Sequence, residues 1–163
     1  MRKYHILIAG LVVLLDQLTK GLVAQKITLH DSIDVVPGLF RLTHVQNQGA
    51  AFGLFSDSPS EWKVAMLILF SLAALAVVSA LLWKNGNALN ATAIALSLVF
   101  GGALGNLWDR VANGKVIDFL DFYVGSHHWP AFNVADSAIV VGALLLLGEI
   151  FLAPQEEKAI SQQ

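Results

Sequence analysis

Two carboxyl groups late in the chain have the surroundings that acid–base chemistry requires. Asp118 lies in the apolar segment 116–122, and Asp136 lies three residues after Asn133, just inside a long apolar run. Carboxylates are costly beside hydrocarbon and are usually kept there for a function. Two carboxylates brought together share one proton, so that one acts as an acid while the other acts as a base. We therefore treat Asp118 and Asp136 as the leading candidates for chemistry.

Each of these carboxylates also has a plain structural explanation. Asn133 would cap a helix, and Asp136 would stand at the positive end of that helix. Asp121 follows Asp118 by three residues, and in an extended segment their side chains point to opposite faces. One would face the helices and the other would face water, and the sequence does not show which. Both could also be ordinary loop carboxylates.

Two further pairs of polar residues are one helical turn apart. Asp16 and Lys20 would form an ion pair within one helix, or part of a polar patch inside a helix bundle. Asn106 and Arg110 would share a face of another helix, with Asp109 offset from them. Arg110 could orient a carboxylate through a bidentate pair, hold a lipid phosphate, or extend toward the membrane interface.

The chain lacks the residues that several other kinds of chemistry require. The chain contains no Cys, which excludes disulfides, thiol catalysis and thiolate metal sites. No GxSxG motif is present. The pair His127-His128 has no third ligand at a recognisable spacing, so we expect no metal and no other cofactor. The net charge of −2 gives no indication of nucleic-acid binding.

The composition indicates an integral membrane protein. The chain is 56% hydrophobic and 13% charged, whereas soluble domains carry about 25% charged residues. Four stretches are long and apolar enough to span a bilayer. They cover approximately residues 6–23, 64–83, 88–108 and 134–152.

The orientation in the membrane is harder to predict. The basic residues Arg2 and Lys3 precede the first apolar stretch as they would in a signal peptide, but polar residues stand where a cleavage site should be. We expect this stretch to be a retained span, so that four spans place both termini on one side. The raw count of Lys and Arg opposes a cytoplasmic N-terminus, yet the first helix usually dominates orientation. We expect both termini to be cytoplasmic.

The loop at about 25–62 is expected to be rich in strands. Residues 32–45 read as short strands around a Pro37-Gly38 turn. Small residues around Phe52 predict a closely approached bend, and residues 58–61 predict a cap for the second span. Other expected features are close helix packing at Gly101 and Gly105 and a polar cytoplasmic tail at 155–163.

Five motifs together resemble one family, the bacterial lipoprotein signal peptidases, also called signal peptidase II. The motifs occupy residues 16–20, 47–53, 101–110, 116–121 and 132–137, in the order of that family, and they cover nearly the whole chain. The resemblance implies an α-helical integral membrane protein with one peptidase domain over 1–163. Its fold would have four transmembrane helices, a small extracytoplasmic β-cradle and a short extracytoplasmic helix.

The resemblance also implies an activity. The family contains aspartyl endopeptidases of the bacterial inner membrane that cut diacylglyceryl-modified prolipoproteins just before the lipidated cysteine. The matching catalytic positions are Asp118 and Asp136, near the extracytoplasmic face. Positions expected to bind substrate or to support the site are Asp16, Lys20, Asn47, Gly49, Asn106, Arg110 and Asn133.

The expected partners are prolipoproteins and membrane lipids, with no nucleic acid, and the protein is expected to be monomeric. With no Cys, no Ser triad and no metal motif, peptide hydrolysis would need water activated by carboxylates. Two other classes of function stay open. One is a small transporter or proton relay that uses Asp16, Arg110 and Asp136, and the other is a chaperone that binds lipoproteins without cleaving them.

Overall fold

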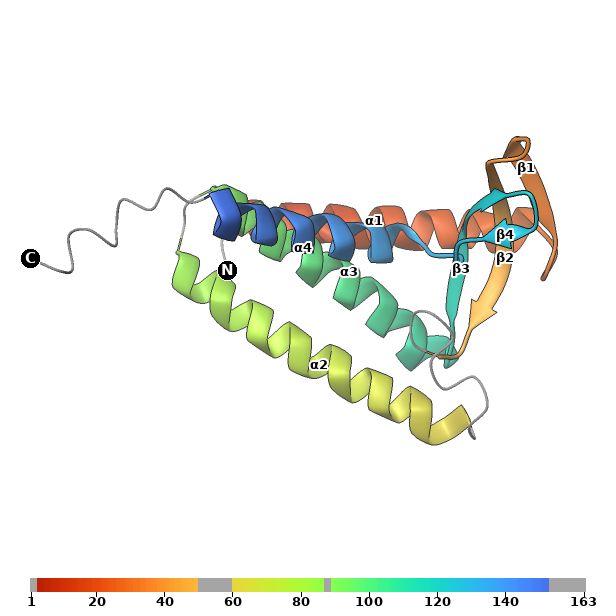
Figure 1. The fold of residues 1–163 in the computed structure, drawn as a ribbon. Helices are drawn as coiled ribbons and strands as arrows, with labels where there is room; N and C mark the ends of the chain where they lie inside the picture. The colour runs from red at the N-terminus through yellow and green to blue at the C-terminus, as the bar shows by residue number, and fades with distance from the viewer. Residues whose placement is uncertain (1–2, 50–59, 87–88, 153–163) are drawn as a thin grey trace, which may run out of the picture.

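Four long helices and a small antiparallel sheet make up the part of the chain that the structure describes, as Figure 1 shows. The structure is a computed structural model that describes residues 3–49, 60–86 and 89–152. The elements are α1 (Lys3–Lys26), β1 (Ser32–Val36), β2 (Phe40–Asn47), α2 (Ser60–Asn85), α3 (Ala91–Asn113), β3 (Val116–Val124), β4 (His127–His128) and α4 (Val134–Leu152). The fold class expected from the sequence, a helical membrane protein with a small sheet, is confirmed.

All four helices are long and apolar enough to cross a membrane. Large apolar side chains are exposed along them, among them Leu7, Leu11, Phe70 and Ile150. In a water-soluble protein such surfaces would drive aggregation, whereas in a bilayer they contact lipid. The outward faces of the helices therefore agree with a membrane-embedded bundle.

The ends of α3 show why hydropathy alone misplaces helix boundaries. Asn90 caps the helix by accepting a hydrogen bond from the Ala93 N–H, so α3 begins after the expected residue 88. Gly114 ends the helix in the left-handed conformation, with its N–H donating to the Arg110 carbonyl. The helix therefore continues beyond the apolar stretch and carries polar residues at its end.

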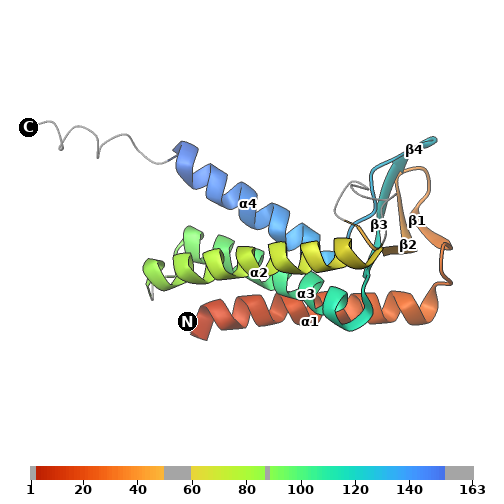
Figure 2. The ribbon, with the colours of Figure 1, turned by 90° about the horizontal axis from the view of Figure 1, so that it is seen from below.

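α3 is the central helix of the bundle. It packs against α1, α2 and α4, whereas α2 packs against α3 alone among the described elements (Figures 1 and 2). A Cβ atom on Gly101 would lie 2.8 Å from the Ala9 carbonyl oxygen, and one on Gly105 would lie 2.8 Å from Asp16 Oδ2. The close packing predicted from Gly101 and Gly105 is therefore confirmed, and it brings α1 against α3.

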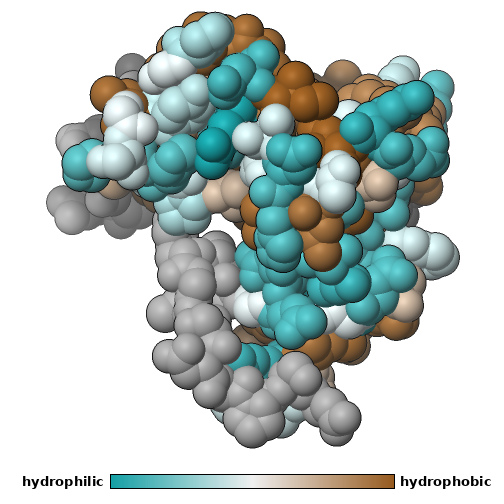
Figure 3. All heavy atoms as spheres, turned by 90° about the vertical axis from the view of Figure 1, so that its right-hand side faces the viewer, coloured by the Kyte–Doolittle hydropathy of each residue, from teal (hydrophilic) through white to brown (hydrophobic). Residues whose placement is uncertain are grey.

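The sheet lies at one end of the bundle and has the strand order β1-β2-β3-β4 (Figure 1). The predicted Pro37-Gly38 turn joins β1 to β2, with Gly38 at φ 82°. Val23 of α1 and Ile27, the residue after this helix ends, pack against Phe119 of β3 and attach the sheet to the helices. Figure 3 looks onto this end, where hydrophilic side chains cover much of the surface and apolar patches lie among them.

The register of the strands decides which polar residues meet. β2 pairs with β3 so that Val45 lies opposite Asp118 and Arg41 lies opposite Asp121. An isolated bridge between Leu120 and Phe132 then draws the segment before α4 alongside β3. As a result, the start of α4 lies next to the middle of β3.

Several expectations concern residues outside the described ranges. The bend around Phe52, the cap residues Ser58 and Pro59, and the tail at 155–163 all lie there. The short additional helix implied by the resemblance is not found among the described residues, which contain α1 to α4.

Candidate functional site

Asp118 and Asp136 are brought together where β3 meets the first turn of α4. Asn133 joins them: its Nδ2 donates to Asp118 Oδ1 at 2.7 Å, and its backbone N–H donates to Asp136 Oδ2 at 3.3 Å. The Asn133 Oδ1 accepts from the Asp136 N–H at 2.9 Å, which is the predicted helix cap. The structural explanation of Asn133 is therefore correct but incomplete, because the same side chain also holds Asp118.

Two other asparagines complete the surroundings of the pair. Asn47 Nδ2 donates to Asp118 Oδ2 at 2.9 Å, and Asn106 Nδ2 donates to Asp136 Oδ1 at 2.7 Å. Gly49 acts one step away, since its N–H donates to Asn47 Oδ1 at 2.8 Å. All four carboxylate oxygens thus accept a hydrogen bond from a neutral N–H group.

The environment of Asp118 shifts its ionisation toward neutral pH. Burial raises the pKa of Asp118 to about 6, and the negative charge of Asp136 also raises it. The hydrogen bonds from Asn47 and Asn133 and the positive charge of Lys20 lower that pKa in part. A carboxyl group with such a pKa exchanges a proton near physiological pH, as acid–base catalysis requires.

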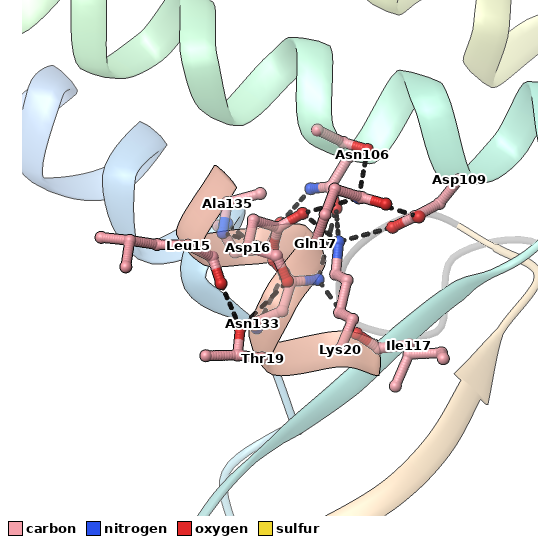
Figure 4. Close-up of polar contacts among 12 residues, drawn as sticks. Leu15, Asp16, Gln17, Thr19, Lys20, Asn106, Asp109, Ile117, Asn133 and Ala135 are labelled. Atoms are coloured by element: carbon pink, nitrogen blue, oxygen red, sulfur yellow. Dashed lines mark hydrogen bonds and ion pairs between the residues drawn. The ribbon is translucent and has the colours of Figure 1, made fainter. Parts of the chain in front are cut away.

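Asp16 and Lys20 form a buried polar cluster between α1 and α3, shown in Figure 4. Lys20 Nζ lies 2.7 Å from Asp16 Oδ2, 2.6 Å from Asp109 Oδ2 and 3.0 Å from Asn106 Oδ1. Asp16 also accepts from the Ala135 N–H at 3.0 Å, one residue before Asp136. Both sequence explanations therefore hold at once, because the ion pair lies within one helix and also lines the bundle interior.

Asp109 and Gln17 are members of this cluster that the sequence interpretation missed. Asp109 is buried and accepts from Gln17 Nε2 at 3.0 Å as well as from Lys20. Asp109 is offset from the helix face that Asn106 and Arg110 share, so the spacing of polar residues did not indicate it. The signal that could have found it is electrostatic, since a buried charge is usually paired with an opposite charge.

Arg110 does not form the bidentate carboxylate pair considered from the sequence. Its Nη1 donates to the Asn106 carbonyl oxygen at 3.2 Å, and no ion pair of Arg110 occurs within the described residues. Its guanidinium group nevertheless lies in the electrostatic field of Asp136 and Asp118. Because the group has five N–H donors, Arg110 retains donors that a ligand at the two carboxylates would meet.

Asp121 has a different environment from the one expected. The prediction that one of the two β3 carboxylates faces water is wrong, because Asp118 and Asp121 are 3% and 4% exposed. Arg41 Nε lies 2.7 Å from Asp121 Oδ2, and His128 Nδ1 lies 3.1 Å from Asp121 Oδ1. Asp121 is therefore covered by basic side chains on the sheet.

No group of His, Asp or Glu side chains suited to a metal ion occurs among residues 3–49, 60–86 and 89–152. His128, one of the two histidines considered for a metal, is instead bonded to Asp121. The chemistry that the described residues support is proton transfer between two carboxyl groups with one shared set of amide donors.

Comparisons with known proteins point to one family. The family model described as signal peptidase (SPase) II matches residues 8–152. A lipoprotein signal peptidase of Solibacter usitatus is 45% identical over 152 residues, which cover 93% of this chain and 92% of that protein. One of Geobacter sulfurreducens is 47% identical over 145 residues, which cover 89% of each chain.

A solved structure has the same fold. It is described as a bacterial membrane enzyme at 1.9 Å resolution, and it superposes with a TM-score of 0.82 at 30% sequence identity. The match covers 93% of this chain and 94% of that chain. The agreement therefore extends over the helices and the sheet together.

Proposed function

Because the chain belongs to the signal peptidase II family, we propose that it removes the signal peptide from diacylglyceryl-modified prolipoproteins by hydrolysis between two aspartates. The cut falls just before the lipidated cysteine. The single observation that carries the aspartyl mechanism is the pair Asp118 and Asp136, joined by Asn133 and surrounded by neutral amides.

The proposed mechanism assigns one proton to the pair. We assign this proton to Asp118, because it is the more deeply buried of the two carboxyl groups and burial beside a second carboxylate disfavours the ionised form. Asp136 is the ionised partner at the positive end of α4. Asp136 takes a proton from water as the water attacks the scissile carbonyl, and Asp118 hydrogen-bonds that carbonyl oxygen. The pair then donates a proton to the leaving nitrogen.

Supporting roles follow from the donors around the pair. Arg110 orients the substrate through its remaining N–H groups, and the carbonyl oxygen of the substrate is a suitable acceptor. Asn47, Asn106 and Asn133 hold the carboxylates in place. Gly49, Asp16 and Lys20 act on these asparagines and on α4 rather than on the substrate.

The lipid on the substrate solves a problem of position. Acyl chains anchor the modified cysteine at one depth in the bilayer, and the pair of aspartates lies where α4 meets the sheet. We place the sheet on the extracytoplasmic side and both termini in the cytoplasm. One chain contributes both aspartates, so a monomer is sufficient for the reaction.

The test uses purified protein and a synthetic lipobox peptide with a diacylglyceryl cysteine, with products identified by mass spectrometry. The wild-type protein should release a peptide that ends immediately before the cysteine. Asp136→Asn should release none while it still inserts and unfolds cooperatively, and the unlipidated peptide should be a poor substrate. Equal cleavage by Asp136→Asn would rule out the aspartate pair.

The same preparation separates the other classes of function. A transporter or proton relay would move ions across vesicles and yield no peptide product. A lipoprotein-binding chaperone would bind the lipidated peptide without cleaving it, in the wild type and in Asp136→Asn alike. Either result would overturn the proposed function.

A further inference from the structure

The three asparagines at the aspartate pair have fixed amide orientations. Each uses its Oδ1 to accept from a group that can only donate, so each Nδ2 must point to a carboxylate. For Asn133 the donor is the Asp136 N–H, and for Asn47 it is the Gly49 N–H. For Asn106 it is an ammonium group, Lys20 Nζ, at 3.0 Å, with a longer contact of 3.3 Å from Asn133 Nδ2.

Lys20 is itself held firmly in place. It is 3% exposed, and its three N–H donors match three acceptors, which are Asp16 Oδ2, Asp109 Oδ2 and Asn106 Oδ1. Within the described residues no hydrogen bond joins Lys20 to Asp118 or to Asp136. Its hydrogen-bonded route to the aspartate pair therefore passes through Asn106, whose Nδ2 donates to Asp136 Oδ1 at 2.7 Å, while its positive charge also acts on the pair at longer range.

We infer that Lys20 is a positioning residue whose ammonium group fixes the Asn106 amide so that Asn106 donates to Asp136. The inference rests on the proposed peptidase function and adds a named route from a lysine in α1 to the aspartate in α4. Asp16 and Asp109 hold the ammonium group from two helices, which is how α1 and α3 jointly set the amide (Figure 4).

A neutral side chain at position 20 would remove this constraint. A glutamine presents both a donor and an acceptor, so the ammonium group would no longer oppose a rotation that turns the Asn106 oxygen toward Asp136, and the longer contact of 3.3 Å from Asn133 Nδ2 would oppose it more weakly. Two oxygen acceptors would then face each other, and the ionised form of Asp136 would lose the hydrogen bond from Asn106 while it keeps the one from the Asn133 N–H. A hydrogen bond to a charged group is worth a factor of about 10 to 100 in rate.

The test is a double-mutant cycle of Lys20→Gln and Asn106→Ala, measured with the lipidated lipobox peptide. We expect Lys20→Gln to lower kcat by about 10- to 100-fold and to leave KM nearly unchanged, since Lys20 does not contact substrate. In the Asn106→Ala background, Lys20→Gln should lower kcat much less, because only the effect of the lost charge is then left. Lys26→Gln, which removes an exposed lysine at the end of the same helix, is the matched control.

Two results would overturn the inference. One is a wild-type kcat in Lys20→Gln, and the other is the same fall in kcat whether Asn106 or Ala stands at position 106. Failure of the wild-type protein to cleave the peptide would instead reject the proposed function itself.

A second variant covers the case in which Lys20→Gln does not fold. The pair Lys20→Met/Asp109→Asn removes one buried cation together with one buried anion, which keeps the balance of charge in the cluster. Placed in the same cycle with Asn106→Ala, it should again lower kcat only when Asn106 is present. An equal fall in both backgrounds would contradict the inference.

Discussion

Asp118 and Asp121 lie three residues apart on one strand and are almost equally buried, yet their partners differ in kind. Asp121 is paired with Arg41 and His128. Among the described residues, Asp118 accepts hydrogen bonds from the amides of Asn47 and Asn133 and from no basic side chain, and a second carboxylate lies beside it. A basic partner stabilises the ionised form of a buried carboxylate, whereas a neighbouring carboxylate favours its protonated form. Burial alone therefore does not identify a catalytic carboxylate, and the charge of its partners does.

The comparison also explains why the two residues are expected to respond differently to substitution. The ion pair of Asp121 ties β2 to β3 and to the segment around β4, so its loss should affect folding. The contacts of Asp118 lead to Asn133 and Asp136 at the start of α4, so its loss should affect chemistry.

The largest expected effect concerns the two aspartates as a unit. Asp136→Asn should lower kcat by at least about 10³-fold, because general acid–base catalysis contributes on this scale. The double variant Asp118→Asn/Asp136→Asn should be no slower than either single variant, since both members of the pair are needed for one proton transfer. Single-turnover cleavage of the lipidated peptide measures this. If the double variant were slower by the product of the two single effects on kcat, the two aspartates would act separately.

The next effect is the pH dependence of stability. The pKa of Asp118 is raised to about 6 in the folded protein, so the folded state holds this proton more tightly than the unfolded state. The stabilisation is fully present below about pH 4 and is lost as the pH rises through 6, which amounts to roughly 3 kcal/mol.

Asp118→Asn should remove this pH-dependent contribution to the free energy of unfolding. Wild-type stability should therefore fall relative to Asp118→Asn between about pH 4 and pH 7, and the two curves should run parallel above that range. Thermal unfolding in detergent across this pH range measures the difference. If the two curves of stability against pH were parallel over the whole range, the pKa of Asp118 would be the same in the folded and the unfolded protein, which would contradict the prediction.

A smaller effect is expected for the other carboxylate on the strand. Asp121→Ala should lower the free energy of unfolding by about 1–3 kcal/mol, because it leaves Arg41 without its partner while that side chain keeps partial access to water. Asp34→Ala is a suitable control, since Asp34 is an exposed carboxylate on the same sheet that accepts a hydrogen bond from Tyr123 Oη and has no ion pair among the described residues. If Asp34→Ala were the more destabilising change, the ion pair of Asp121 would have no special role.

The smallest expected effect is a shift in the pKa of Asp118 when an amide that donates to it is removed. The hydrogen bond from Asn47 lowers the pKa of Asp118, so Asn47→Ala should raise that pKa further. If Asp118 carries the shared proton, the alkaline limb of the pH–rate profile should move to higher pH, by up to about one unit. Gln48→Ala, at the exposed neighbour of Asn47, should leave the profile unchanged. A shift toward lower pH would contradict the assigned sign.

The sequence predicted the helices, the strands and the start of α4 because each leaves a local signal. Apolar length marks a span, Pro37-Gly38 marks a turn, and Asn133 before Asp136 marks a helix start. The proximity of Asp118 to Asp136 has no such signal. It depends on the bridge between Leu120 and Phe132, which is a contact between segments.

Contacts between elements also account for the other differences. Asp109 meets Lys20 because of the axial position of α1 against α3, which the close approach at Gly105 sets. Arg41 covers Asp121 because of the register between β2 and β3, which is irregular between Leu42 and Val45. Neither the axial position nor the register can be derived from the residues of one element alone.

The most direct test of the account is a side-by-side measurement of kcat/KM for Asp118→Asn and Asp121→Asn on the lipidated lipobox peptide. Both substitutions replace a buried carboxyl group on β3 with an amide of nearly the same shape. The account predicts that Asp118→Asn loses at least about 10³-fold in kcat/KM, while Asp121→Asn stays within about tenfold of the wild type because it affects mainly stability. Wild-type turnover by Asp118→Asn, or complete loss of activity in a folded Asp121→Asn, would contradict it.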